Sequence, residues 1–323
     1  MAFRHGEIVI ECFRRGVVTS LRKHVYIKHR TLEEHKMTQG IMAILIIIAI
    51  LAVFFVVVMI IDGNRFHTVN YKLSSNKIEK EHRYVVLSDL HNKTYGKQNE
   101  RLLREIYKLQ PEAILIAGDI LTAKPGKSYE VALDFIRNLA KEYPIYYGMG
   151  NHETRLFLYP EVYGDMGERY QRDLNNISVF FMKNESREYG DHIRITGLDM
   201  KRDYYKRFKK NPMDSSYLNE TLEKVKEDNY EILLAHNPDY FEEYASWGAD
   251  LVLSGHIHGG MMRLPILGGV VSPAFKLFPK YDGGVFRNGK STMILSRGLG
   301  MHTIPIRIFN PGELILLELK PKK

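Results

Sequence analysis

The chain has 323 residues, which is enough for one large domain or two small ones with a buried core. Its 45% hydrophobic and 26% charged residues are ordinary for a globular protein. The formal net charge of +8 would suit nucleic-acid binding, but the first 40 residues supply half of it, so we discount that function. The single cysteine, Cys12, excludes an intrachain disulfide and any cysteine-based metal site.

An apolar segment follows a basic N-terminal tail. Residues 1–40 contain eight Lys or Arg and four Glu, whereas residues 41–61 carry no charge. At about 1.5 Å per residue, these 21 residues span roughly 31 Å, the thickness of a bilayer's hydrocarbon core. A buried core helix or a pair of strands is the alternative, but either would normally contain polar residues or a turn. Because the run also exceeds the apolar part of a cleavable signal peptide, we predict one uncleaved transmembrane helix at residues 41–61.

The charges beside this helix bear on its orientation. The positive-inside rule favours a single-pass membrane protein with a cytoplasmic N-terminus and an extracytoplasmic main domain. The asymmetry is small, because Arg65, Lys72 and Lys77 follow the helix closely. Residues 62–82 are polar and of mixed charge, so they predict a linker or an irregular first strand before a domain at residues 83–323.

The domain begins with alternating strand and helix patterns. Strands are predicted at residues 84–88, 113–117 and 145–148. Between them, Leu102, Ile106 and Leu109 lie on one face of a helix that Pro111 ends, and residues 131–139 mark a second helix. This βαβαβ order calls for a parallel sheet.

The second half of the domain contains mostly strands. They are predicted at residues 177–181, 193–197, 232–235, 251–254, 293–296 and 314–319, with one clear helix at 217–227. Two packed sheets with helices outside accommodate both halves. We therefore expect an α/β fold, a four-layer α/β/β/α sandwich of two mixed sheets with outer helices, preceded by the transmembrane helix.

Residues that can bind metal follow five of these strands. In chain order they are Asp89 and His91, Asp119, Asn151, His236, and finally His256 and His258. Ligands of α/β sheets bind beyond the carboxyl ends of the strands, so the five segments would converge on one site. Within Asp89-x-His91 and His256-x-His258, an extended chain would direct both side chains the same way. One such pair is a weak signal, whereas five segments in this order predict a metal site.

The ligand types indicate which metals and which chemistry to expect. Imidazole, carboxylate and amide oxygen without thiolate suit Mn, Fe, Zn or Co rather than a structural zinc site. One carboxylate can bridge two divalent ions about 3.5–4 Å apart, and a water shared between them becomes a hydroxide nucleophile near neutral pH. The ions also neutralise a phosphoryl group in the transition state, so hydrolysis needs no protein nucleophile.

The chain resembles the calcineurin-like metallophosphoesterase superfamily over about residues 82–320. Five motifs carry the resemblance: Asp89-x-His91, Gly118-Asp119, Gly150-Asn151-His152-Glu153, His236 and Gly255-His256-x-His258. The small bacterial membrane-associated members are the most similar. That narrower resemblance is carried by His236-Asn237-Pro238, Gly259-Gly260, Arg263-Leu264-Pro265 and residues 296–300.

The resemblance implies a role for each of these residues. Asp119 would bridge the two metal ions. The other ligands would divide into Asp89, His91 and His258 on the first ion and Asn151, His236 and His256 on the second. His152 would lie outside the metal shells, where it would stabilise the transition state and protonate the leaving oxygen, or else hydrogen-bond a carboxylate. Glu153 would be a structural partner.

Other residues are candidates for binding the substrate. Asn92 follows His91 and could reach the phosphate, or it could stabilise a turn. Arg263 could clamp a phosphate with two hydrogen bonds or form an ordinary salt bridge, and Arg297 has the same two possibilities. Residues 156–174 contain four aromatic residues and could form a loop that roofs the site. Residues 201–210 are strongly basic and could hold an anionic substrate or lipid headgroups, or form a solvated face.

These features predict an enzyme, a phosphoric ester hydrolase with two divalent metal ions as cofactors. It would cleave phosphate mono- or diesters, and its anchor would bring lipid or envelope phosphates within reach. A non-catalytic binding or scaffold protein of the same fold is the alternative, although all the ligands are present. A nuclease is a third hypothesis, against which the lack of an extended basic stripe argues, so neither nucleic acid nor an obligate protein partner is expected.

Overall fold

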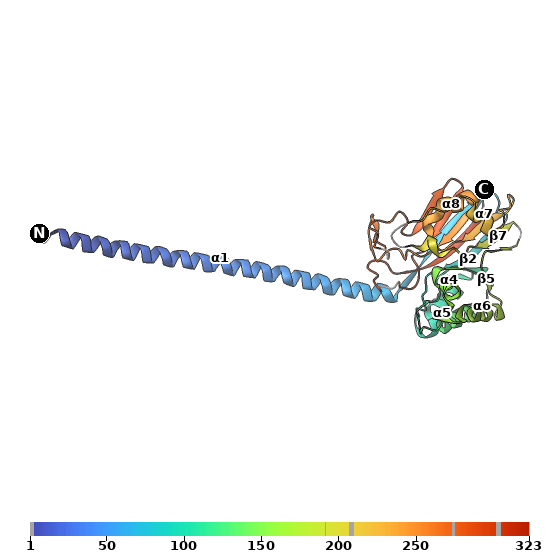
Figure 1. The fold of residues 1–323 in the computed structure, drawn as a ribbon, viewed down its shortest axis with the longest axis horizontal. Coiled ribbons are helices and arrows are strands. Elements are labelled where there is room, and N and C mark those ends of the chain that lie inside the picture. Colours follow the sequence, from blue (N-terminus) through green and yellow to red (C-terminus); the bar gives the residue numbers. More distant parts are fainter. Residues whose placement is uncertain (1–2, 191, 207–209, 273–274, 302–304, 323) are drawn as a thin grey trace. The chain divides into compact units, whose positions relative to one another are not determined.

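The computed structural model describes residues 3–190, 192–206, 210–272, 275–301 and 305–322 (Figure 1). The chain divides into two compact units, Met1–Val57 and Val58–Lys323. A single helix of 62 residues, α1 (Phe3–Asn64), contains the predicted span and extends back through most of the basic tail. The apolar part of α1 is long enough to cross a membrane, and its most apolar stretch is not buried in the protein at all. A core helix of a soluble protein would be buried, so α1 is a candidate membrane span.

Six strands form the first sheet of the Val58–Lys323 unit. Their order is β1 (Phe66–Ser75), β14 (Gly312–Pro321), β2 (His82–Leu87), β3 (Ala113–Ala117), β4 (Ile145–Gly148) and β5 (Phe180–Met182). The four strands from β2 to β5 are parallel, and β14 pairs antiparallel with β2 and parallel with β1. The connecting helices α2 (Glu100–Leu109) and α3 (Glu130–Ala140) confirm the predicted βαβαβ beginning.

Six further strands form the second sheet. Their order is β12 (Gly284–Asn288), β13 (Ser291–Leu295), β9 (Leu251–Ser254), β8 (Tyr230–Leu234), β7 (Ile193–Gly197) and β6 (Glu185–Glu188). The central strands from β13 to β7 are parallel, and the two edge strands are antiparallel to their neighbours. A separate short hairpin consists of β10 (Met262–Leu264) and β11 (Gly268–Val271).

Three hydrophobic cores separate the layers. Val85 and Leu87 of β2 face a core shared with α2 and α3, whereas Tyr84 and Val86 face a core shared with the second sheet. A third core lies between the second sheet and the helices α7 (Tyr217–Thr221) and α8 (Phe241–Trp247). Alternate residues of one strand thus serve two cores, because successive side chains point to opposite faces. The four-layer sandwich is confirmed. Figure 1 shows α4 (Asn151–Leu158), α5 (Pro160–Tyr163) and α6 (Met166–Asn176) on the opposite side of it from α7 and α8.

Three local expectations were wrong. The segment expected to be a linker or an irregular strand contains β1, a regular ten-residue strand that β14 holds in register. The helix expected at residues 217–227 ends at Thr221, where the next residue adopts an extended conformation. The expected roofing loop consists of α4 (Asn151–Leu158), α5 (Pro160–Tyr163) and α6 (Met166–Asn176), whose Tyr170 and Leu174 are buried in the first core.

Candidate metal centre

The predicted ligands lie together at one edge of both sheets. Asp89 and His91 follow β2, Asp119 follows β3, and Asn151 is the first residue of α4 after β4. From the second sheet, His236 follows β8, and His256 and His258 follow β9. The two sheets meet there, because the Nδ1 of His236 lies 2.6 Å from the carbonyl oxygen of Ala117 in β3. Five segments that are distant in the sequence thus converge on one place.

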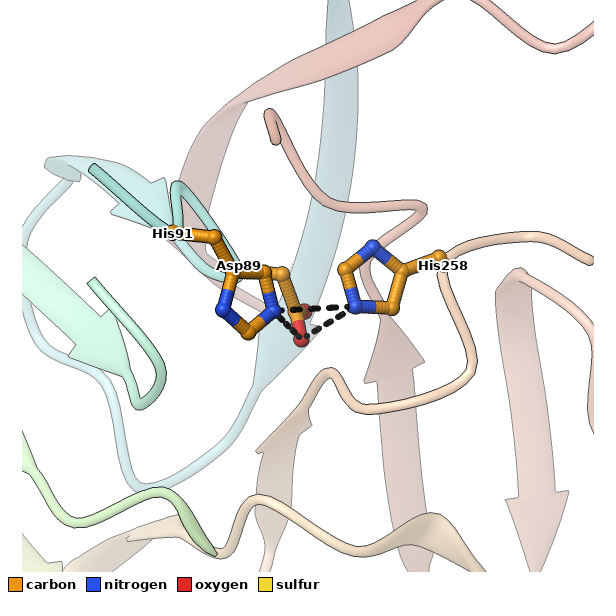
Figure 2. Close-up of side chains that lie close together, drawn as sticks. All are labelled: Asp89, His91 and His258. Carbon is orange, nitrogen blue, oxygen red and sulfur yellow. Dashed lines mark hydrogen bonds and ion pairs between the residues drawn. The ribbon is translucent and has the colours of Figure 1, made fainter. Parts of the chain in front are cut away.

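Asp89, His91 and His258 form a first cluster, which Figure 2 shows. The Nε2 atoms of His91 and His258 lie 3.1 Å apart. Both face the Oδ1 of Asp89, at 3.8 Å from His91 and 3.2 Å from His258. Two imidazole nitrogens and one carboxylate oxygen that converge in this way are suited to share a cation.

Asp119, His236 and His256 form a second cluster. The Oδ2 of Asp119 lies 3.1 Å from the Nε2 of His236 and 3.8 Å from the Nε2 of His91 in the first cluster. This oxygen therefore faces both clusters, as a bridging ligand must. The Oδ1 of Asn151 is buried and accepts no hydrogen bond from the described residues, which leaves it available to a cation.

Hydrogen bonds fix the ligands in orientations suitable for metal binding. The Nδ1–H of His236 donates to the carbonyl of Ala117, so Nε2 is the ring nitrogen that faces the Asp119 carboxylate and that a cation could take from it. The backbone N–H of His152 donates to the Oδ1 of Asp119 at 2.8 Å, which leaves the Oδ2 for the two clusters. Glu153 accepts hydrogen bonds from the backbone N–H groups of Asp119, Ile120 and Gly150 and thus holds the loop after β3 against the start of α4.

The ligands turn into the centre through an unusual backbone conformation. Asp89, His91, Asp119, His256 and His258 have φ between +52° and +74°, the left-handed region that Asp, Asn and His enter more readily than most residues. The expectation of extended Asp-x-His and His-x-His segments was therefore wrong, although both residues of each pair do reach the centre. Strained backbone of this kind concentrates at functional sites.

Close packing leaves no room for side chains beside the ligands. A Cβ on Gly255 would collide with the Oγ of Ser88 and the Oδ2 of Asp89. That Oδ2 also accepts hydrogen bonds from Ser88 Oγ at 2.6 Å and from His256 N at 3.1 Å. The glycine before His256 thus allows one carboxylate oxygen to be fixed while the other faces the first cluster.

The two carboxylates are buried without a lysine or arginine partner. Asp89 is 0% and Asp119 2% exposed, and within the described part of the chain their ion pairs involve histidines alone. Burial lowers the pKa of His236, but the charges of Asp119 and Asp89 outweigh burial and raise that pKa to about 10. The site thus favours positive charge, and divalent cations fit this set of carboxylate, imidazole and amide donors.

His152 lies beside the clusters with a defined tautomer. Its Nδ1 accepts a hydrogen bond of 2.9 Å from the backbone N–H of Ala123, so the proton of the neutral ring is on Nε2. Burial lowers the pKa of His152, which favours this neutral form. The ring lies 4.8 Å from that of His91, centroid to centroid. His152 can therefore offer an N–H to a group bound at the first cluster.

A cleft of about 410 Å³ opens beside His91 and His152. Asn92 lines it, with its Nδ2 bound to the carbonyl of Ser128 and its Oδ1 buried without a hydrogen-bond partner among the described residues. The remaining lining side chains are Lys93, Thr122, Lys124, Lys127, Met301 and Pro305. The three lysines form no ion pair within the part of the chain that the structure describes, so the cleft attracts anions.

The two candidate arginines are engaged within the protein. Arg263 donates to the carbonyl oxygens of Gly259 and Asp282 and lies 3.2 Å from the Asp282 carboxylate. Arg297 forms hydrogen bonds of 3.1 and 2.9 Å to the Oε1 of Glu313. Both arginines therefore form the salt bridges that were the alternative to phosphate binding. A contact between Arg263 and a phosphate stays a prediction.

The sequence did not single out a second cleft, of about 510 Å³, on the Asn151 side of the centre. It is lined by Asn151, Thr154, Arg155, Leu158, Arg202, Asp203, Tyr205 and Lys206. The ring of Tyr205 packs on that of His256 at 5.3 Å. Part of the basic segment 201–210 therefore reaches the metal centre, while residues 207–209 lie outside the described residues. The aromatic pair Tyr204-Tyr205 within a basic run was the available signal.

The fold and the donor set define a class of metal-dependent phosphoesterases. The sequence profile of that class, Calcineurin-like phosphoesterase, matches residues 82–260, which is more than half of the chain. The chain belongs to the calcineurin-like phosphoesterase family, which confirms the resemblance found in the motifs.

Several curated proteins are similar to this chain. An uncharacterized metallophosphoesterase of Helicobacter pylori is 28% identical over 251 residues, which cover 76% of this chain and 62% of the relative. The uncharacterized metallophosphoesterase YkuE of Bacillus subtilis is 24% identical over 73% of this chain and 78% of its own length. The UDP-2,3-diacylglucosamine pyrophosphatase LpxG of Chlamydia muridarum is 23% identical over 73% and 83%. The chain thus spans less than two thirds of the Helicobacter relative.

Proposed function

We propose that this protein hydrolyses phosphate mono- or diesters at a dinuclear metal centre. Asp119 would bridge two divalent ions, with Asp89, His91 and His258 on one and Asn151, His236 and His256 on the other. The observation that supports this assignment is the position of the Asp119 Oδ2, which faces a histidine nitrogen of each cluster. When bound, the two ions supply an activated water and neutralise the phosphoryl oxygens.

The chain's own groups would position the phosphate and the proton. The lysines of the cleft attract the anionic group towards His91, and His152 directs its Nε2–H at it. This N–H can stabilise the charge that develops on a phosphoryl oxygen. Protonation of the leaving oxygen would need the imidazolium form, which burial and the Ala123 N–H disfavour, so His152 would act as a hydrogen-bond donor. The backbone N–H of Ala123 keeps the proton on the required nitrogen.

We further propose that the substrate is a phosphate carried by a membrane or envelope component. An apolar α1 would keep the centre close to a membrane, and the relative LpxG is by its name a pyrophosphatase of a diacylated sugar nucleotide. The basic tail favours a cytoplasmic N-terminus and an extracytoplasmic domain. Protease treatment of intact cells tests this orientation, since only an outward domain is digested.

The decisive experiment uses the full chain, loaded with Mn²⁺, and a substrate panel. The panel holds aryl phosphate mono- and diesters, a nucleotide, a polynucleotide, a phospholipid and an isoprenoid phosphate. We expect turnover that Asp119→Asn abolishes and that the exposed Asp134→Asn on α3 leaves unchanged. Absence of turnover and of bound metal in the wild type would favour the scaffold alternative, and turnover of the polynucleotide alone would favour a nuclease.

A further inference from the structure

A small β-platform lies next to the metal centre, formed by residues 261–272, 275–278 and 307–309. It begins three residues after His258 and contains the β10–β11 hairpin. Leu277 bridges to Val271 of β11, and Ile308 bridges to Met262 of β10, so backbone pairing connects the three segments. The N–H of Phe278 also donates to Val270, and that of Arg263 to Ile308.

Large apolar side chains project from this platform into solvent. Their exposed fractions range from 41% to 106%, and we call them the apolar patch: Ile266, Leu267, Phe275, Leu277, Phe278 and Phe309. Elsewhere in the described part of the domain, exposed apolar residues such as Val162 and Val285 are scattered. Exposed apolar side chains gathered on one small element normally mark a contact with a protein or a membrane.

The platform is fixed to the point where the apolar part of α1 ends. The apolar run ends at Ile61, and the Oδ2 of the next residue, Asp62, accepts a hydrogen bond of 3.0 Å from the N–H of Asn310. Asn310 directly follows Phe309 of the patch. Gly63 is a neighbour of Met301, since a Cβ added to it would meet the Met301 Sδ at 3.4 Å, an ordinary contact distance. The patch is therefore anchored where the chain would leave a membrane.

The same asparagine connects this point to the metal centre. The Nδ2 of Asn310 donates to the carbonyl oxygens of His258 and Gly260 at 2.7 and 2.8 Å. Met301 also lines the lysine-containing cleft, together with Pro305. The cleft thus has a cationic side and an apolar side, and its apolar side adjoins the end of α1.

We infer that the apolar patch inserts into the interfacial region of the membrane that α1 crosses. Interfacial elements bury their apolar side chains about 5–10 Å deep, at the level of the headgroups and first acyl carbons. This contact would hold the cleft over the same leaflet. Combined with the proposed function, on which this step rests, it assigns the substrate to lipids whose phosphate enters among the lysines while the acyl chains remain in the bilayer.

Insertion is tested with the full chain in lipid nanodiscs. Cys12→Ser removes the native thiol, and Leu277→Cys or Lys290→Cys then carries an environment-sensitive fluorophore. Lys290 lies in the β12–β13 turn, at the opposite end of the second sheet from the metal ligands. We expect the label at Leu277 to be blue-shifted and quenched by nitroxide lipids, and the label at Lys290 to be neither. Equal, water-like emission at both positions overturns the inference, and so does a blue shift without quenching, since a protein or a second copy would then cover the patch.

The consequence for substrate is tested separately. Leu277→Asp with Phe278→Asp should raise the KM for a bilayer-embedded lipid phosphate by roughly tenfold or more, because charged side chains leave the interface. The double variant should turn over a soluble aryl phosphate as the wild type does. The control variant Val162→Asp changes an exposed apolar residue of α5 and should leave the activities towards both substrates unchanged. An unchanged KM for the lipid overturns this part. If the wild type turns over no phosphate ester at all, the proposed function fails, whereas the fluorescence result still decides insertion.

Discussion

In two neighbouring polar regions of the domain, the buried charged side chains have different kinds of partner. In the metal centre, the buried carboxylates of Asp89 and Asp119 face histidine nitrogens and, among the described residues, no lysine or arginine. In the arginine cluster, formed by Arg263, Arg297 and Arg307, each guanidinium has its partners within the protein. Arg307 is 2% exposed and donates to the carbonyls of Arg297, Gly298 and Gly300, and Arg297 binds Glu313.

The contrast separates candidate function from structural support. Both regions carry motif residues and both are largely buried, so residue type alone does not distinguish them. What differs is whether polar atoms are left for an outside partner. The Oδ1 of Asn151 has no hydrogen-bond partner among the described residues and is left for an outside partner, whereas the guanidinium of Arg263 is paired with Asp282.

Removal of the metal ions should have the largest effect, because it acts on the metal centre and leaves the arginine cluster intact. Chelation should abolish activity, and Mn²⁺ should restore it, because the buried carboxylates lose the cations that balance them. Unfolding should also become easier by roughly 4 kcal/mol for a site loaded at about 1,000 times its Kd. Elemental analysis, phosphatase assays and thermal melts measure these effects. Full activity in a preparation shown to be free of metal would contradict the assignment.

His152→Ala should have the next largest effect. Loss of the Nε2–H should lower kcat by about 10²–10³-fold, the usual cost of removing one hydrogen-bond donor to a developing oxyanion, while the bound metal stays in place. The exposed His192→Ala serves as the control and should behave as wild type. A variant that keeps its kcat but loses metal would show that His152 supports the ligands rather than the phosphoryl group.

Glu313→Gln should affect stability rather than chemistry. Glu313 is fully buried, and its loss leaves the Arg297 guanidinium without its carboxylate, at a cost of about 3–5 kcal/mol. Glu318→Gln on the same strand removes a partner of the exposed Lys72 and should cost about 0–1 kcal/mol. Denaturant titration compares the two. A large loss of kcat in the folded Glu313→Gln protein would place the arginine cluster in the active site.

Arg263→Ala should have the smallest effect and decides between the two roles considered for this residue. If Arg263 only supports the hairpin, its loss should cost about 1.5–3 kcal/mol of stability, the range of hydrogen bonds to charged groups, without a change in KM. If it clamps the phosphate, KM for a small aryl phosphate should rise while the melting temperature hardly changes. Steady-state kinetics and thermal melts of one preparation give both values.

The fold was largely predictable because its strands have clear local signals. The strands β3, β4, β7 and β9 begin and end as predicted. β3 and β9 are short runs of mainly apolar residues, and β7 alternates apolar and polar residues. The sequence failed where elements are short or their apolar pattern is interrupted. The seven-residue helix α8 and the glycine-containing hairpin β10–β11 were missed for that reason.

The sequence by itself determined the order of the strands, the candidate ligands at their ends and the apolar segment of α1, because each depends on residues close together in the chain. Only the tertiary structure decided the rest. The left-handed backbone at Asp89 and His258, the pairing of Arg297 with Glu313 and the approach of Tyr205 to His256 all depend on segments far apart in the sequence. The same is true of Asn310, which joins the end of α1 to the loop of His258. Contacts of this kind follow from tertiary packing and cannot be inferred from a local sequence pattern.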